Sequence, residues 1–341
     1  MKAPDFWWSS STTLSAAVLS PVSWIYGWIS ARKMHSKPKG ESRLPVVCIG
    51  NFVVGGTGKT PFSLMLAELL KNESLRPGFL LRGYGGSEQG PLLINPDDHV
   101  ARQVGDEALM LARSGPTIIS SDRVAGARLA EKQQIDVLLM DDGFQNPALK
   151  KDLSFVLVDA AYGLGNGKCL PSGPLRAPMS AQIVATDVLV VVGEGQQAEP
   201  AIKLASRKGI PIIYARLEPG YMDELKNVSL YAFAGIGRPE KFYDTLRALK
   251  LDVAETLSFP DHHEFSEAEA RKLLELSEQR HLQLVTTEKD MVRIETARPE
   301  IFRWLATRTE VLPVHMRVPD GERLSHIVQE RINKRRYELG R

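Results

Sequence analysis

A short glycine-rich segment carries the clearest chemical signal in this sequence. Gly55-Gly-Thr-Gly-Lys59-Thr60 follows an apolar run over residues 45–50 and precedes a helical pattern over residues 61–70. In that context, successive backbone N–H groups and the positive end of a helix dipole bind a polyphosphate. The lysine would reach the β- and γ-phosphates, and the following threonine would ligate Mg²⁺. The predicted phosphate loop consists of Val53, Val54, Gly55, Gly56, Thr57, Gly58, Lys59 and Thr60, with Val53 where the strict pattern has glycine.

A pair of carboxylates supports this prediction. Residues 135–140 form an apolar run, and Asp141 and Asp142 follow it directly. Carboxylates at the end of a buried strand hold Mg²⁺ or its water ligands beside a phosphate loop. The candidate metal ligands are therefore Thr60, Asp141 and Asp142. Spacing alone does not distinguish between the two aspartates, and an acidic turn is the structural alternative.

Two positions separate the classes of nucleotide-binding protein. In Thr287-Glu-Lys-Asp290 the lysine stands one place too late for a guanine-recognition motif, which disfavours a GTPase. Val54 stands where the paired-subunit ATPases carry a lysine, which disfavours that class as well. A small-molecule kinase remains.

A kinase must deprotonate or orient an acceptor hydroxyl, and two segments outside the loop offer candidates. Asp106 opens a predicted helix, and His262 precedes a helix that Ser266 and Glu269 cap. A histidine held by a carboxylate is a competent general base near neutral pH. A surface loop histidine is the alternative.

The elements around these residues alternate between strand and helix. Near-continuous apolar strands separated by helices are typical of a parallel sheet covered on both faces. We predict an α/β fold with a mostly parallel sheet of the P-loop NTPase type, a second smaller α/β domain and an N-terminal membrane-associated helix. The predicted strands are 45–50, 78–82, 117–120, 135–140, 153–158, 187–192, 210–214, 229–234 and 282–286, and the predicted helices are 61–70, 105–113, 123–132, 239–249 and 267–280. The expected domains are 1–40 as helix and linker, 41–220 as kinase domain, and 221–341 as the smaller domain closing over the site.

The N-terminal segment contains no Asp, Glu, Lys or Arg between Phe6 and Ala31. At helical spacing, Leu14, Val18, Val22, Ile25 and Ile29 form one stripe, and small polar residues form the opposite face. Three interpretations compete: a signal peptide, which the flanking residues disfavour; a helix packed on the protein's own core; and an amphipathic helix on a membrane. The density of tryptophan and tyrosine favours the membrane.

The composition excludes several other classes. The 341 residues are 43% hydrophobic and 25% charged, which is close to a globular average. The net charge is +2, so no overall field attracts nucleic acid. Two cysteines, Cys48 and Cys169, cannot form a thiolate zinc site or a disulfide scaffold.

Taken together, these motifs resemble the tetraacyldisaccharide 4'-kinases, the lipid A 4'-kinases of Gram-negative bacteria. The resemblance covers about residues 12–330. The matching runs are Ile49-Gly-Asn-Phe-Val-Val-Gly-Gly-Thr-Gly-Lys-Thr-Pro61, Leu81-Arg-Gly-Tyr-Gly85, Val104-Gly-Asp-Glu107, Ser121-Asp-Arg123, Met140-Asp-Asp-Gly-Phe-Gln145, Gly163-Leu-Gly-Asn-Gly167, Leu170-Pro-Ser-Gly-Pro-Leu-Arg176, Ala234-Gly-Ile-Gly-Arg-Pro239, Phe259-Pro-Asp-His262 and Thr286-Thr-Glu-Lys-Asp290.

The resemblance implies transfer of the γ-phosphate of ATP, with Mg²⁺, to the 4'-hydroxyl of an acylated glucosamine disaccharide 1-phosphate, giving lipid IVA. It also implies that Asp106 and His262 act together on that hydroxyl, and that valine at position 53 is ordinary for the family. One departure is Ala177, where the family usually has glutamate.

The expected location is the cytoplasmic face of the bacterial inner membrane, peripherally or with shallow insertion. The expected partners are the lipid substrate and the membrane surface, with neither nucleic acid nor an obligate protein partner. The alternative from another class is a membrane-docked P-loop ATPase that acts as a switch on a protein partner.

Overall fold

A large sheet forms the frame of the protein in the computed structural model, which describes residues 4–9 and 13–340. Across those residues, nine strands lie in the order β13-β8-β7-β6-β1-β5-β2-β4-β3. All neighbours are parallel except the two edge pairs, β13 with β8 and β3 with β4. The strands are β1 Val46–Asn51, β2 Pro77–Leu81, β3 Leu92–Leu93, β4 Thr117–Ile119, β5 Val137–Asp141, β6 Leu153–Asp159, β7 Val188–Val192, β8 Ile212–Pro219 and β13 Val314–Arg317.

Helices cover both faces of this sheet because successive strand residues point to opposite sides. Val47 and Ile49 share a core with α2, α4 and α12, whereas Val46 and Cys48 share one with α5, α6 and α7. We call the sheet and these helices the large lobe. Its helices are α2 Lys59–Asn72, α3 Ala101–Val104, α4 Asp106–Ala112, α5 Arg123–Ala130, α6 Met179–Val184, α7 Glu199–Arg207 and α12 Gly321–Glu338. The predicted α/β class is confirmed.

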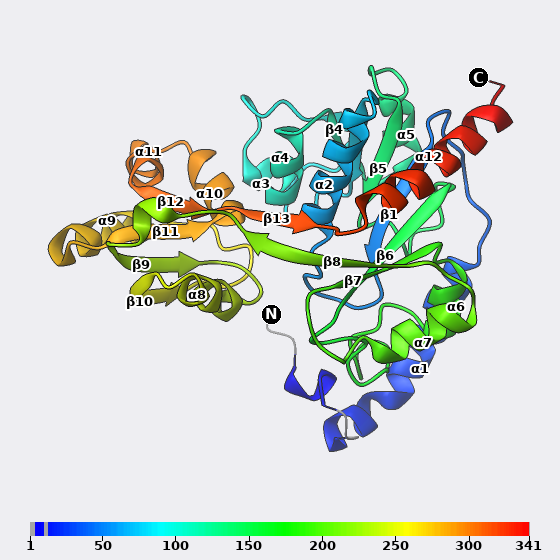
Figure 1. The fold of residues 1–341 in the computed structure, drawn as a ribbon, viewed down its shortest axis with the longest axis horizontal. Coiled ribbons are helices and arrows are strands. Elements are labelled where there is room, and N and C mark those ends of the chain that lie inside the picture. The colour runs from blue at the N-terminus through cyan, green and yellow to red at the C-terminus, as the bar shows by residue number, and fades with distance from the viewer. Residues whose placement is uncertain (1–3, 10–12, 341) are drawn as a thin grey trace.

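The second unit, the small lobe, is built on a separate parallel sheet in the order β10-β9-β11-β12. One face packs on α8, and the other packs on α9, α10 and α11. β8 and β13 run from the large sheet to this lobe (Figure 1). The elements are η2 Asp223–Leu225, β9 Ser229–Ala234, α8 Pro239–Ala248, β10 Asp252–Ser258, α9 Glu267–Arg280, β11 Gln283–Thr287, α10 Glu288–Glu295, α11 Glu300–Thr307 and β12 Thr309–Leu312.

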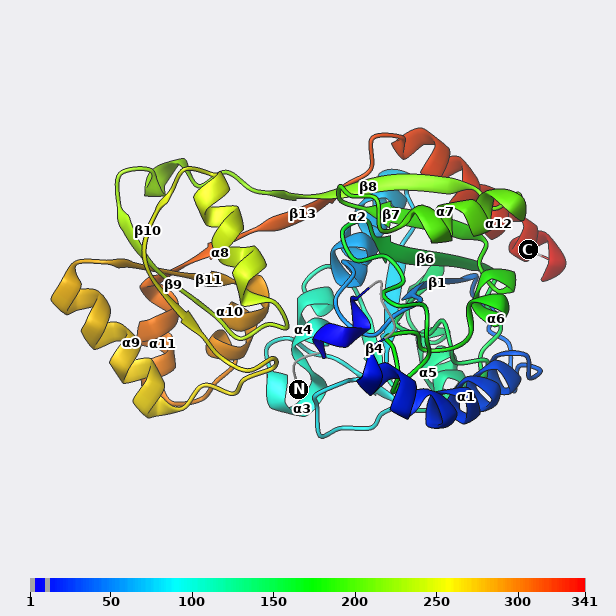
Figure 2. The same ribbon diagram turned by 90° about the horizontal axis from the view of Figure 1, so that it is seen from below.

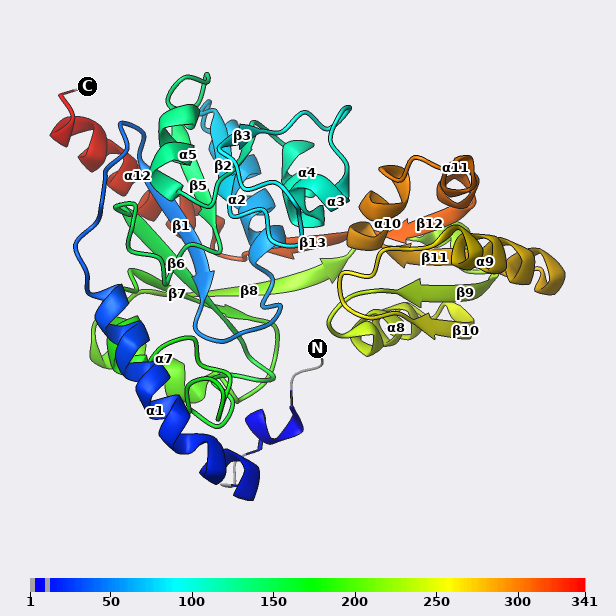
Figure 3. The same cartoon turned by 180° about the vertical axis from the view of Figure 1, so that it is seen from behind.

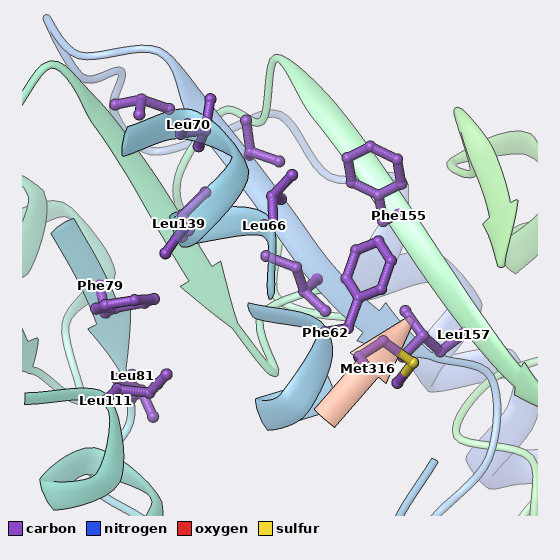
Figure 4. Packing of buried hydrophobic residues seen from close by; sticks show 14 of the residues in the cluster. Phe62, Leu66, Leu70, Phe79, Leu81, Leu111, Leu139, Phe155, Leu157 and Met316 are labelled. Carbon is purple, nitrogen blue, oxygen red and sulfur yellow. The ribbon is translucent and has the colours of Figure 1, made fainter. Parts of the chain in front are cut away.

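The end of the chain corrects the predicted boundary of the smaller domain. After β12 the chain returns to the large sheet as β13, and α12 covers that sheet. Met316 of β13 lies beside Phe62 of α2 and Leu157 of β6 (Figure 4). Residues 221–341 therefore do not form one unit. The helix α12 was not predicted from the sequence, and only the packing shows which sheet it covers.

The N-terminal helix α1, Leu14–Met34, lies along the outside of the large lobe (Figure 3) and contacts α6. It follows the short turn η1, Asp5–Trp7. Ala16, Ser23 and Gly27 are its buried residues, and the Ser23 hydroxyl donates to the Cys169 carbonyl at 2.6 Å. The helix thus packs through its small polar face. Residues 1–3 and 10–12 of the predicted 1–40 segment lie outside the described residues.

The opposite face of α1 carries the apolar stripe, and it points away from the protein. Trp24 is 86% exposed, and it is accompanied by other exposed apolar side chains on the same helix. Figure 2 shows α1 at the edge of the large lobe. In the described ranges, α1 is the single helix long and apolar enough to cross a membrane. The exposed stripe residues and their flanks are Leu14, Val18, Val22, Trp24, Ile25, Tyr26, Trp28 and Ile29.

Candidate active site

The predicted phosphate loop connects β1 to α2. Gly55 and Gly58 have φ angles of +109° and +85°, conformations that glycine adopts without strain. A Cβ atom added at Gly55 or Gly56 would have no atom of the described residues within 4 Å, apart from its own chain neighbours. The Thr57 hydroxyl is buried and, in residues 4–9 and 13–340, lacks a hydrogen-bond partner. The loop thus presents open backbone and a free polar group, as a polyphosphate site requires.

Lys59 and Thr60 begin α2 and face the end of β5. The Lys59 Nζ atom lies 3.7 Å from the Asp142 Oδ1 atom, and its side chain is 12% exposed. The Thr60 hydroxyl donates to the Asp141 Oδ2 atom at 3.4 Å. The structure therefore brings the predicted phosphate-binding and metal-binding residues together.

The two aspartates have different surroundings. Asp142 also pairs with Arg176 at 2.9 Å, while Arg176 Nε donates to the Val53 carbonyl. Burial alone would raise the pKa of Asp142, but the charges of Lys59 and Arg176 lower it overall. Burial raises the pKa of Asp141, whose Oδ1 atom finds no hydrogen-bond partner within the described residues. Asp142 is engaged with cations, whereas Asp141 has a free oxygen.

Asp106 and His262 meet although they lie 156 residues apart in the chain. Asp106 begins α4 in the large lobe, and His262 lies in the loop between β10 and α9 of the small lobe. The His262 Nδ1 atom is 3.1 Å from the Asp106 Oδ2 atom. This hydrogen bond raises the pKa of His262, with burial opposing it. The proximity that the resemblance implied is present.

Asp106 is ionised, which settles the direction of that hydrogen bond. Burial alone would raise its pKa, but the bond with His262 and the charge of Arg293 lower the pKa well below its ordinary value. A carboxylate can only accept, so the Nδ1 atom of His262 donates. The Nε2 atom then carries the lone pair.

Three charged partners were not among the predicted site residues. Arg293, on α10, donates to Asp106 through its Nε atom at 2.9 Å. Lys289, one turn earlier, pairs with Glu107 at 2.5 Å, and Glu107 in turn raises the pKa of Asp141. Arg176, described above, is the third. Arg176 and Lys289 lie within motifs quoted for the resemblance, so their positions were visible but their partners were not.

The phosphate loop, the strand-end carboxylates and the Asp106–His262 pair thus lie on one two-lobed fold. The tetraacyldisaccharide-1-P 4'-kinase family matches residues 15–333 of the chain. The chain belongs to this family. The family predicted from the motifs is thereby confirmed.

Curated members of the tetraacyldisaccharide 4'-kinase family cover nearly the whole chain. The protein from Methylobacterium nodulans is 46% identical over 325 residues, which is 94% of each chain. The protein from Parvibaculum lavamentivorans is 40% identical over 341 residues, covering 98% of this chain and 99% of its own.

A solved member of the family has the same fold. The crystal structure of LpxK from Aquifex aeolicus in complex with ATP superimposes with a TM-score of 0.72 at 26% identity, covering 93% of this chain and 99% of that one. Ala177, the departure from the family pattern, is fully buried here, and its carbonyl accepts from Gln182 at 2.7 Å. It supplies no carboxylate to the site.

Proposed function

We propose that this protein transfers the γ-phosphate of ATP to the 4'-hydroxyl of tetraacyldisaccharide 1-phosphate, forming lipid IVA. Family membership over residues 15–333 supports this function. The relatives that cover nearly the whole chain carry the name tetraacyldisaccharide 4'-kinase. ATP as the phosphoryl donor is supported by the complex of the Aquifex aeolicus protein.

The observation that carries the proposal is that this protein has phosphate-binding and metal-binding residues together with a pair that can accept a proton. Lys59 and Thr60 lie against the carboxylates at the end of β5. Asp106 precedes Glu107, whose charge raises the pKa of Asp141. Glu107, next to Asp106 of the proton-accepting pair, therefore lies close enough to the metal-site carboxylate Asp141 to act on its charge. This supports one site for phosphate binding and proton transfer.

The phosphate loop positions the donor. Backbone N–H groups around Gly55–Gly58 and the start of α2 bind the phosphates, and the Lys59 ammonium compensates the charge on the β- and γ-phosphate oxygens. Arg176 holds Val53 and Asp142 in place through its two contacts. The loop thus presents fixed donors where charge develops during transfer.

The donor set at the end of β5 fits Mg²⁺. Asp141 has a buried oxygen without a hydrogen-bond partner in the described chain, next to the Thr60 hydroxyl. Hard oxygen ligands of this kind suit Mg²⁺, which would neutralise charge on the transferred phosphate. We assign Thr60 and Asp141 as ligands, and Asp142 to the loop cations or to a metal-bound water.

His262 accepts the proton of the acceptor hydroxyl. Its Nδ1 atom donates to Asp106, so Nε2 is the basic nitrogen. The ionised Asp106 stabilises the imidazolium that forms. Because one residue comes from each lobe, the pair is complete only when the lobes are in contact.

The N-terminal helix brings the enzyme to its lipid. Four acyl chains hold the acceptor in the bilayer, at about 0.8 kcal/mol for each CH₂ that would have to be exposed to water. The outward stripe of α1 suits the headgroup and acyl boundary. A hollow lined by Tyr26, Ser30 and Lys33 of α1 and by Val54 and Arg176 joins this helix to the phosphate loop. We propose peripheral or shallow attachment at the cytoplasmic face of the inner membrane.

Transfer of label from [γ-³²P]ATP to purified tetraacyldisaccharide 1-phosphate in detergent micelles tests the function. We expect labelled lipid with the wild-type protein and at most about a tenth of that rate with Lys59→Ala at saturating ATP, because the variant lacks the compensating charge. ATP hydrolysis without labelled lipid would instead support the switch that acts on a protein partner. Family membership already disfavours that alternative.

A further inference from the structure

Arg293 contacts the carboxylate of the proton-accepting pair from the small lobe. It lies on α10, and its Nε and Nη2 atoms both donate to the Asp106 Oδ2 atom. That same oxygen receives the hydrogen bond from His262. The guanidinium therefore fixes the position of the oxygen that orients the imidazole ring.

Arg293 also supports the loop that carries His262. Its Nη1 atom donates to the Gly235 carbonyl at 2.8 Å, and the backbone N–H of His262 donates to the same carbonyl at 3.2 Å. Asp290 completes the arrangement, because its Oδ1 atom accepts from Arg293 at 2.7 Å and from the Gly235 N–H at 3.0 Å. A Cβ atom at Gly235 would lie 3.0 Å from that oxygen, so this close approach depends on glycine.

The cluster is shielded from water. The side chain of Arg293 is 7% exposed, and those of Asp106 and Asp290 are 3% and 0% exposed. A planar guanidinium with five donors can serve two carboxylates and a carbonyl at once, which an ammonium at the end of a flexible chain cannot do with the same geometry. The arrangement thus needs arginine in particular.

We propose that Arg293 is a positioning residue that holds Asp106 and His262 in register across the two lobes. This inference rests on the proposed function of that pair. Arg293 acts through the pair, since it contacts neither nucleotide-loop nor metal-site residues in its hydrogen bonds. Misplacing a reacting group by about 1 Å costs about 100-fold in rate.

The electrostatics give this role a signature that simple stabilisation lacks. Asp106 and Asp261 raise the pKa of His262, whereas the charge of Arg293 lowers it, and the ring of Tyr84 packs edge-on against the imidazole. Removing the guanidinium charge therefore moves the acidic limb of the kcat profile to higher pH. Keeping a charge there as lysine leaves the limb near its wild-type position.

The test compares full-length Arg293→Met, Arg293→Lys and Arg113→Met in the lipid-labelling assay. For Arg293→Met we expect kcat to fall about 100-fold, KM for ATP to change less than about threefold, and the acidic limb to move to higher pH. For Arg293→Lys we expect a fall of at least about tenfold with the limb unmoved. If Arg293→Met fails to fold, judged by its melting transition, Arg293→Lys carries the test.

Arg113→Met is the matched control. Arg113, at the end of α4, pairs with Glu295 of α10 at 2.5 Å, so it bridges the same two helices without touching Asp106. We expect its kcat to stay within about threefold of wild type, because exposed ion pairs contribute little. Equal losses in the control, or full activity in Arg293→Lys, would overturn the positioning role. Absence of lipid labelling by the wild type would instead overturn the proposed function.

Discussion

Asp141 and Asp142 are adjacent in the chain, yet their carboxylates have different partners. Asp142, at a φ of +54°, turns its carboxylate toward Lys59 and Arg176. Asp141 continues the strand geometry and contacts Thr60. The positive φ of Asp142 thus directs the two adjacent carboxylates to different partners, which supports the different roles that we propose for them.

Substitution of these aspartates separates the two roles. Asp141→Asn removes the free charged oxygen, so we expect the Mg²⁺ concentration for half-maximal activity to rise at least about tenfold. Asp142→Asn should lower kcat with a smaller change in Mg²⁺ dependence, because it loosens Lys59 and Arg176. Activity titrated with Mg²⁺ at fixed ATP measures both. If both variants match wild type at low Mg²⁺, the carboxylates form only a turn.

The Asp106–His262 pair predicts a pH profile with a defined sign. The base must be neutral, so activity is lost as pH falls through the raised pKa of His262. Asp106→Asn removes the carboxylate that raises this pKa, so the acidic limb of kcat moves to lower pH. His262→Ala eliminates that limb and lowers kcat by about 10²- to 10⁴-fold.

The same two residues should also behave as one unit. We expect the Asp106→Ala/His262→Ala double variant to lose about as much kcat as either single variant, because effects within a catalytic unit are not additive. Measurements at saturating substrates check this. Multiplicative losses would show two independent roles and leave the phosphate loop and Mg²⁺ as the main source of rate.

At the scale of elements, α1 differs from a surface helix of a typical soluble protein in the direction of its apolar side chains. Its small face packs inward through Ala16, Ser23 and Gly27, and its large apolar side chains point outward. Exposing such a stripe to water is unfavourable, and a lipid surface removes that cost. The element is therefore built to be covered by something other than its own lobe.

A surface triple variant tests this without disturbing the buried face. Trp24→Ser/Ile25→Ser/Trp28→Ser should weaken binding to phosphatidylethanolamine–phosphatidylglycerol vesicles at least about tenfold, since it removes the inserting groups. Activity on a short-chain acceptor in solution should be retained. Sedimentation with vesicles and the labelling assay measure the two effects.

Trp304→Ser is the control, because Trp304 is also an exposed tryptophan but lies on α11 of the small lobe. It should bind vesicles like the wild type. Equal loss of activity on both acceptors in the triple variant would show that the stripe belongs to the fold itself. Deletion of residues 1–30 is a less specific test because it also removes the buried contacts of Ala16, Ser23 and Gly27.

At the scale of the whole molecule, the last segment of the chain packs into the core of the large lobe. Leu324, Val328 and Ile332 of α12 lie in the same core as Phe62 of α2. A Cβ atom at Gly58 would lie 2.9 Å from the Cε atom of Met316, so β13 contacts the end of the phosphate loop, where α2 begins. The chain enters the small lobe once and returns.

This topology predicts that substitutions in the core of α12 destabilise the large lobe. Leu324→Ala should destabilise the protein by about 2–5 kcal/mol in urea unfolding, because it leaves a cavity in a packed core. Amide hydrogen exchange should accelerate in α2 and β6. The exposed Lys334→Ala on the same helix should change stability by less than about 0.5 kcal/mol. Faster exchange confined to the small lobe would contradict this account.

The local sequence pattern was sufficient to predict the elements at the centre of the candidate site. The apolar run before Gly50, the glycines of the loop and the carboxylates after residue 140 are contiguous signals, and each was predicted at its observed place. The helix over residues 267–280 was predicted at its observed bounds because Ser266 and Glu269 form a capping box. These features depend on hydrogen bonds and dihedral angles within a few residues.

Other features depend on long-range packing, which no local signal specifies. The polar alternation of β10 and the short β12 and β13 were not predicted, because strands of that length and pattern are ambiguous without a sheet to join. The return of residues 314–338 to the large lobe was not predicted either. It depends on which apolar surface the other elements leave uncovered, and that is known only once they have packed.

Residue types and their near spacing were sufficient to identify the family and to select the candidate residues with their expected chemistry. Which charged side chains contact each other became visible only in the folded protein. The tertiary structure brought Arg293 to Asp106 across 187 positions and Lys289 to Glu107 across 182. It also turned the apolar face of α1 outward. Such contacts arise from how two lobes and one helix dock, and docking is set by the whole packed surface rather than by any segment of it.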